Sequence, residues 1–125
     1  MLNQTILDHF QNPRNAGELP EPALSVEVTN PVCGDILCLW ILADVETIRQ
    51  IRFKARGCVS SIACGSALTE LVQGKSLAEA KGLNSGDIAK ALNGLPPEGG
   101  HASALAIDAL TAVIKIVRED QAFSY

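Results

Sequence analysis

The sequence has little positive charge, and it lacks the common catalytic motifs. Lysine and arginine number 10 against 14 aspartates and glutamates, so the formal net charge is -4 at pH 7. Nucleic-acid-binding domains usually carry a basic surface, and this balance therefore argues against a nucleic-acid partner. A glycine-rich phosphate loop, a nucleophile elbow and a Cys–His pair close in sequence are also missing. We therefore do not expect an enzyme.

Targeting signals are absent as well. Met1 leads directly into a polar, helix-like stretch, without the leader pattern of a secreted protein. No apolar run has the length that a membrane span requires. We therefore expect a cytoplasmic protein without a membrane partner, whose thiols stay reduced. The four cysteines are then core residues, metal ligands or reactive thiols rather than disulfides.

The patterns that are present predict one α+β domain over residues 1–125. Alternating or continuous apolar stretches predict strands at 24–28, 36–43 and 51–56, the last two forming an antiparallel hairpin. Helical periodicity predicts helices at 2–10, 87–92 and 103–119. Capping signals predict two more, one from Ser60 or Ser61 to Val72 and one that begins after the capping box of Ser76 and Glu79. Three strands followed by helices predict a small three-stranded antiparallel sheet with helices packed on one face.

Two cysteines occur in turns next to glycine. Cys33 lies in "NPVCGD" (30–35), and Asp35 follows two positions later, on the same face if the segment is extended. Cys58 follows a predicted strand at the start of the next helix, where negative charge is stabilised. A thiolate and a carboxylate on one face are half of a plausible metal site.

The remaining candidates have weaker local signals. Cys38 lies in the middle of an apolar strand and Cys64 on the apolar stripe of a helix, so we expect both in the core. His101 follows a loop rich in proline and glycine, and it is either a ligand or a surface residue. His9 has no such context, and we expect a structural role for it.

Three ordered segments resemble the iron–sulfur cluster scaffold family of IscU and the NifU N-terminal domain. They are "NPVCGD", "GCVSSIACGSALTELVQGKS" and "LPPEGGHASALAIDAL", and "DHFQNPRNAGEL" is similar to the family's N-terminal helix and turn. The resemblance covers almost the whole chain. It implies a site of Cys33, Asp35, Cys58 and His101 that binds a [2Fe–2S] cluster, iron or, at the same ligands, zinc. It also implies two kinds of partner, a cysteine desulfurase and apo iron–sulfur acceptor proteins.

The chain departs from the family at two places. Ala102 stands where the family has a third cysteine, so Cys64 is a possible substitute ligand. "LPPEG" replaces the family's Leu-Pro-Pro-Val-Lys, which weakens the case for recognition by a dedicated Hsp70-type chaperone. Two hypotheses follow: a cluster scaffold or carrier, and a non-assembling, zinc-binding relative that docks on a cysteine desulfurase and regulates it.

Overall fold

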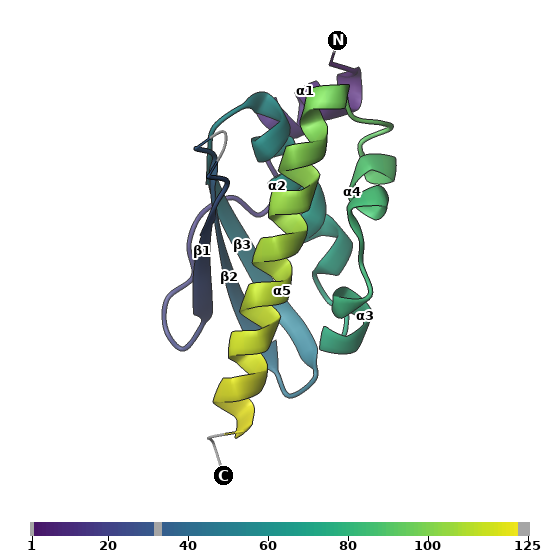
Figure 1. Cartoon of the computed structure of the whole chain (residues 1–125). Coiled ribbons are helices and arrows are strands. Elements are labelled where there is room, and N and C mark those ends of the chain that lie inside the picture. The colour runs from purple at the N-terminus through teal and green to yellow at the C-terminus, as the bar shows by residue number, and fades with distance from the viewer. Residues whose placement is uncertain (1, 32–33, 123–125) are drawn as a thin grey trace.

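A computed structural model describes residues 2–31 and 34–122 of the chain (Figure 1). The elements are α1 (Gln4–Gln11), β1 (Leu24–Thr29), β2 (Ile36–Asp44), β3 (Thr47–Arg56), α2 (Val59–Val72), α3 (Leu77–Lys81), α4 (Ser85–Ala91), the 3-10 turn η1 (Pro97–Gly99) and α5 (Gly100–Ala122).

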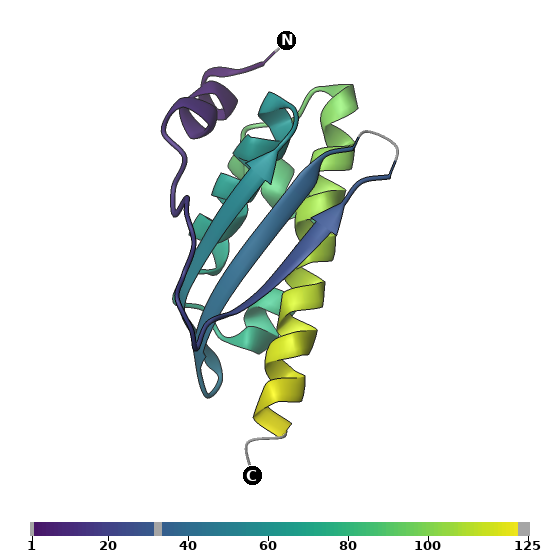
Figure 2. The same ribbon diagram turned by 90° about the vertical axis from the view of Figure 1, so that its left-hand side faces the viewer.

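The strands form one antiparallel sheet, as the sequence predicts, and their order in it is β1-β2-β3 (Figure 2). Ile36, at the start of β2, pairs with Thr29 on one side and with Arg56 on the other. β3 begins at Thr47, four residues earlier than predicted. The β2–β3 pairing continues to Asp44 and Thr47 across a bulge between Leu42 and Ala43, and this irregularity obscures the strand's alternation in the sequence.

Cys38 faces away from the core, so its predicted core position is wrong. Side chains of a strand alternate between the two faces of the sheet. Leu37 and Leu39 face the helices and are at most 1% exposed, whereas Cys38 lies on the other face and is half-buried. It pairs with Glu27 and Lys54, and its thiol donates a hydrogen bond to Glu27 Oε1 at 3.5 Å.

The helices cover one face of the sheet, which confirms the predicted layers (Figure 2). α2 packs on β3, while α5 packs on β1, β2 and α2. Removing the apolar side chains between these layers from water stabilises the fold. The fully buried large side chains in this core include Leu37, Leu39, Ile41, Ile51, Leu68, Val72 and Leu110.

α5 is long and apolar enough, by length and composition alone, to cross a membrane. Its most apolar 18-residue window has a mean hydropathy of 1.4, but every such window contains the charged residues Asp108 and Lys115, so it is not an uninterrupted apolar run. Half of that window is buried inside the fold, and Ala106, Ala109 and Leu110 are at most 2% exposed. This burial is typical of the core helix of a folded domain.

His9 joins α1 to the rest of the molecule, which confirms its structural role. Its side chain is buried, and Nδ1 lies 2.8 Å from the hydroxyl oxygen of Ser66 on α2. The same hydroxyl oxygen accepts a hydrogen bond from the backbone N–H of Arg14 at 2.8 Å. Beyond this point the chain runs along β3, where Gly17 N–H donates to the carbonyl of Phe53 at 2.9 Å.

The helix starts agree only partly with the sequence-based predictions. Ser76 and Glu79 form the predicted capping box, and Asn84 and Asp87 form a second one that begins α4. The N-cap of α2 is Cys58 rather than Ser60 or Ser61, and both serines lie inside the helix. α5 begins at Gly100, three residues before the predicted start.

Candidate metal centre

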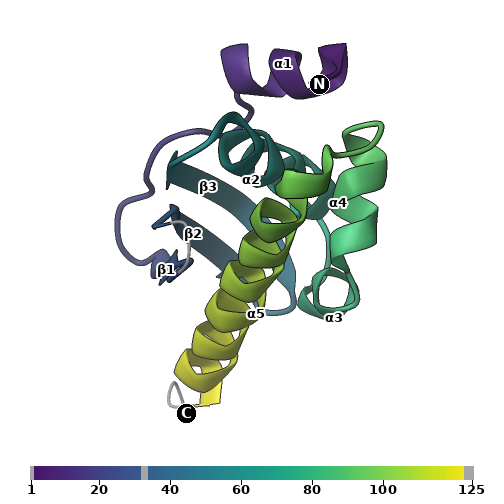
Figure 3. The same cartoon turned by 45° about the horizontal axis from the view of Figure 1, so that its top comes forward.

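Cys58 lies at one end of the molecule, where α2 and α5 begin and where β2 also begins (Figures 1 and 3). It is the N-cap residue of α2, its side chain makes no capping hydrogen bond, and it is exposed. The first N–H groups of a helix and the positive end of its dipole stabilise negative charge at such a position. The exposed thiol is therefore placed where a metal ligand can function.

Strand pairing brings Asp35 beside Cys58. Ile36 pairs with Arg56, so the residue before β2 and the residues after β3 meet at the same end of the sheet. Asp35 Oδ2 accepts a hydrogen bond from the Cys58 thiol at 3.5 Å and another from the Ser61 hydroxyl at 2.5 Å. Two of the four predicted ligands are therefore in contact.

Gly57 leaves the space that the Asp35 side chain occupies. Its φ is +145°, which L side chains rarely adopt. A Cβ at this position would lie 2.3 Å from Asp35 Oδ1 and 2.4 Å from Asp35 Cγ. A side chain here would therefore displace the carboxylate, and a glycine is required for Asp35 to reach Cys58.

The spacing of the two ligand atoms fits a tetrahedral metal ion. Zinc bonds of about 2.3 Å to sulfur and about 2.0–2.2 Å to a carboxylate oxygen, at a tetrahedral angle, place the two ligand atoms about 3.5–3.7 Å apart. The observed distance from Cys58 Sγ to Asp35 Oδ2 is 3.5 Å. A metal ion can therefore take the place of the thiol proton without moving either side chain far.

Cys33, the third predicted ligand, lies outside the described residues. The segment on either side of it is closed by backbone hydrogen bonds. Gly34 N–H donates to the carbonyl of Asn30 at 2.7 Å, and Asn30 N–H donates to the carbonyl of Asp35 at 2.8 Å. Asn30 and Gly34 are therefore held next to Asp35.

His101, the fourth predicted ligand, lies on the first turn of α5 and is exposed. It lines a small cavity of about 170 Å³ together with Asn30 and Pro31, which belong to the segment that carries Cys33. Among residues 2–31 and 34–122, no three His, Cys, Asp or Glu side chains lie close enough together to hold a metal ion. His101 therefore does not form such a group with Cys58 and Asp35. The fold therefore brings His101 to the first motif but not into the Cys58–Asp35 pair.

Ala102 and Cys64 are both buried near these motifs. Ala102, at the position where the resemblance implies a family cysteine, is 4% exposed in the core. Cys64 is 0% exposed, as expected of a core residue. The pKa of the Cys64 thiol is raised to about 12, mainly by burial and to a lesser extent by the charge of Cys58. Because metals bind the thiolate, this environment disfavours Cys64 as a ligand in the described arrangement.

Ser61 is a site residue that sequence reasoning missed. It lies on the first turn of α2 and is 3% exposed. Its hydroxyl contacts both Asp35 Oδ2, at 2.5 Å, and Cys58 Sγ, at 3.4 Å. The available signal was its position three residues after Cys58, since residues three apart on a helix are neighbours.

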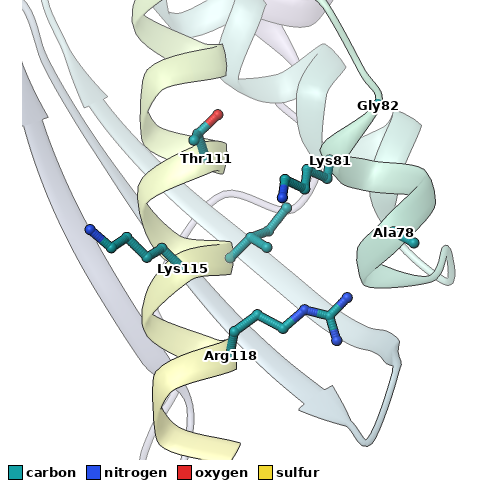
Figure 4. A pocket seen from close by; sticks show the side chains of 7 residues that line it. Ala78, Lys81, Gly82, Thr111, Lys115 and Arg118 are labelled. Atoms are coloured by element: carbon teal, nitrogen blue, oxygen red, sulfur yellow. The ribbon is translucent and has the colours of Figure 1, made fainter.

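A larger pocket, of about 730 Å³, lies elsewhere, between α3 and α5 (Figure 4). Lys81, Lys115 and Arg118 are among its lining residues. Arg118 Nη1 also pairs with Glu46 Oε1 at 2.6 Å. Positive side chains repel metal cations, so this pocket is not the predicted metal site.

Comparison with protein families matches residues 1–122 to the NifU-like N terminal domain. Among curated proteins, the chain is 40% identical over 114 residues to the iron-sulfur cluster assembly scaffold protein IscU 1 of Archaeoglobus fulgidus, covering 91% of this chain and 74% of that protein. It is 42% identical over 116 residues to the scaffold protein IscU of Rickettsia prowazekii, covering 90% of this chain and 88% of that protein.

Two solved structures share the fold. One is described as a putative iron-sulfur cluster assembly scaffold protein for the SUF system from Fervidobacterium islandicum, with a TM-score of 0.76, 23% identity, and coverage of 90% of this chain and 95% of that one. The other is the N-terminal part of a nitrogen-fixing NifU-like protein from Brucella abortus, with a TM-score of 0.73, 22% identity, and coverage of 94% of both chains.

Proposed function

The chain belongs to the NifU-like N-terminal domain family, and on that premise we propose that it is a scaffold for iron–sulfur cluster assembly. Its relatives in Archaeoglobus fulgidus and Rickettsia prowazekii are named as such scaffolds. The cluster is then cargo, built on the chain and passed to an apo acceptor protein. A cysteine desulfurase supplies the sulfur, and a reducing, cytoplasmic compartment keeps the thiols available.

The proposal is based mainly on the contact between Cys58 and Asp35. A thiol and a carboxylate oxygen 3.5 Å apart, at an exposed helix start, have the spacing of two ligands on one tetrahedral ion. With Cys33 and His101 they make a set of two sulfur, one oxygen and one nitrogen donor. Such a set suits the irons of a [2Fe–2S] cluster and, as an alternative occupant, zinc.

Anaerobic reconstitution tests the proposal. The chain is incubated with a cysteine desulfurase, cysteine, ferrous iron and a thiol reductant that supplies the electrons for converting persulfide sulfur to sulfide, and visible absorption is followed. We expect cluster absorption in the parent chain, none in Cys58→Ser, and an unchanged yield in Cys38→Ser, whose thiol lies on the outer face of the sheet. A parent chain that develops no cluster absorption under these conditions contradicts the proposal.

Asp35 gives the cluster its lability. A carboxylate oxygen binds soft metal centres less firmly than a thiolate does, and its site is partly open to solvent. Asp35→Ala is therefore expected to slow cluster transfer to an apo-ferredoxin several-fold, measured from the appearance of the holo-ferredoxin spectrum. Equal or faster transfer from the variant argues against this role.

A second candidate function rests on Ala102. The side chain at this position is a methyl group in the core, so the chain has one thiol fewer for receiving sulfur than the family it resembles. A zinc-loaded chain of this kind would dock on a cysteine desulfurase and alter its turnover. Desulfurase turnover with and without the zinc-loaded chain tests this function. Unchanged turnover together with no binding eliminates it.

A further inference from the structure

We propose that Ser61 is a positioning residue for Asp35, holding its carboxylate in the orientation in which it shares a metal ion with Cys58. This inference rests on the proposed function and adds one residue to its site. Ser61 is on α2, and Asp35 precedes β2, so the contact joins two residues that are 26 positions apart in the sequence.

The hydrogen bond from Ser61 restricts Asp35 from one side. The hydroxyl oxygen lies 2.5 Å from Asp35 Oδ2, within the range of a hydroxyl donating to a charged carboxylate. Ser61 is 3% exposed and lies within a helix, so the position of its hydroxyl is set by the fold rather than by solvent.

Gly57 restricts Asp35 from the other side. A Cβ at Gly57 would meet Asp35 Oδ1 at 2.3 Å, so this oxygen lies directly against the backbone of the β3–α2 connection. The carboxylate is therefore confined between Gly57 and Ser61 before any ion binds. A ligand confined in this way loses less conformational freedom when the metal ion binds.

The bond to Ser61 is compatible with metal coordination by the same carboxylate. An ionised carboxylate has about four lone-pair positions on its two oxygens. Asp35 Oδ2 uses one for Ser61 and one for the Cys58 thiol. When the thiol proton leaves and an ion takes its place, the bond from Ser61 remains and continues to orient the ligand. Partners that orient ligating side chains typically contribute about 10–100-fold in metal affinity.

Cobalt titration of the apo chain tests the proposal without requiring cluster assembly. Co²⁺ alone is titrated into the parent chain, Ser61→Ala, Ser60→Ala, Asp35→Ala and the double variant Asp35→Ala with Ser61→Ala, and the visible spectrum reports binding. Ser60 is the matched control, because it is equally buried on the same turn but makes no hydrogen bond to Asp35 among the described interactions. Urea unfolding of each apo variant shows that it is folded.

We expect Ser61→Ala to lower the Co²⁺ affinity by about 10-fold or more while the thiolate-to-cobalt absorption at saturation persists. Ser60→Ala should bind like the parent. In the Asp35→Ala background, Ser61→Ala should have no further effect, because the group that it positions is gone.

Two outcomes overturn the assignment of Ser61 while leaving the scaffold function intact. One is that Ser61→Ala binds Co²⁺ as tightly as the parent or more tightly. The other is that Ser61→Ala lowers the Co²⁺ affinity as much in the Asp35→Ala background as in the parent. A parent chain that neither binds Co²⁺ nor assembles a cluster overturns the scaffold function and this inference together.

Discussion

At the scale of single residues, the three described cysteines lie in different surroundings. Cys58 is exposed at a helix start, Cys38 is half-buried on the outer face of the sheet, and Cys64 is fully buried. Burial, followed by the hydrogen bond to Glu27, raises the pKa of the Cys38 thiol. Cys38 and Cys58 each have a carboxylate oxygen 3.5 Å from the thiol, but of the described cysteines only Cys58 is exposed and lies at a helix start. The fold therefore distinguishes Cys58 from the other two.

These surroundings predict different costs for replacing sulfur by oxygen. Cys64→Ser places a hydroxyl in an apolar core and should lower the free energy of unfolding by about 1–3 kcal/mol. Cys38→Ser should change it by less than about 0.5 kcal/mol, as is usual for substitutions away from the core. Urea unfolding at neutral pH measures both. Equal losses, or a larger loss for Cys38→Ser, would contradict the assignment of Cys38 to the outer face.

At the scale of elements, α1 depends on a buried, neutral histidine. Burial, and next the positive charge of Arg14, lowers the pKa of His9 below its ordinary value of 6.5, although Glu70 and Asp8 act in the opposite direction. The unfolded chain therefore binds a proton on His9 at a higher pH than the folded chain does. Its contribution to stability is fully present above pH 6.5 and is lost as the pH falls toward the folded-state pKa.

We therefore expect the free energy of unfolding to decrease between pH 7.5 and pH 5.5, with a contribution from His9 of at most about 1.4 kcal/mol per pH unit. His9→Gln should flatten this dependence. Urea unfolding at several pH values measures the slopes. A slope that persists in His9→Gln would show that other groups cause it.

The short helix α3 depends on its N-cap. The Ser76 hydroxyl accepts the Glu79 N–H at 3.0 Å, and the Glu79 carboxylate accepts the Ser76 N–H at 3.0 Å. Ser76→Ala should therefore cost about 1 kcal/mol of stability, measured by urea unfolding. Ser85→Ala, at an exposed first residue of α4, is the control and should be nearly neutral. A neutral Ser76→Ala would mean that tertiary packing alone holds α3.

At the scale of the whole molecule, one end of the fold collects the candidate site. The N-terminal ends of α2 and α5 and the start of β2 lie together there (Figure 3), although residues 30, 58 and 101 are far apart in the chain. An ion bound between these elements connects parts of the molecule that separate on unfolding. Such binding should stabilise the entire fold, because the unfolded chain does not hold the ligands together.

Zinc should therefore raise the Tm of the chain. At a free zinc concentration 100 times the Kd, the stabilisation is about 2.7 kcal/mol, which corresponds to about 10 °C in a domain of this size. EDTA should reverse the shift. Cys58→Ser should show a much smaller shift, and Cys38→Ser the full one. A full shift in Cys58→Ser would place the zinc site elsewhere.

Local sequence patterns determined the kinds of elements and much of their order. Apolar alternation marked β1, helical periodicity marked α2 and α5, and Ser76 with Glu79 marked the start of α3, because each signal depends on residues a few positions apart. The turns next to glycine likewise singled out Cys58 and Cys33 from the other cysteines. The ligand roles, however, came from the resemblance of three ordered motifs to a known family.

Tertiary structure alone decided which side chains meet. The continuous apolar run of β2 carries no alternation, so only its pairing and the packing of the helices set Cys38 outward and Leu37 inward. The contact of Asp35 with Cys58 and Ser61 depends on the register that pairs Ile36 with Arg56. The register of the strands and the face of the sheet on which each side chain lies are long-range properties. Both follow from burying one face of the sheet beneath helices that occur later in the chain.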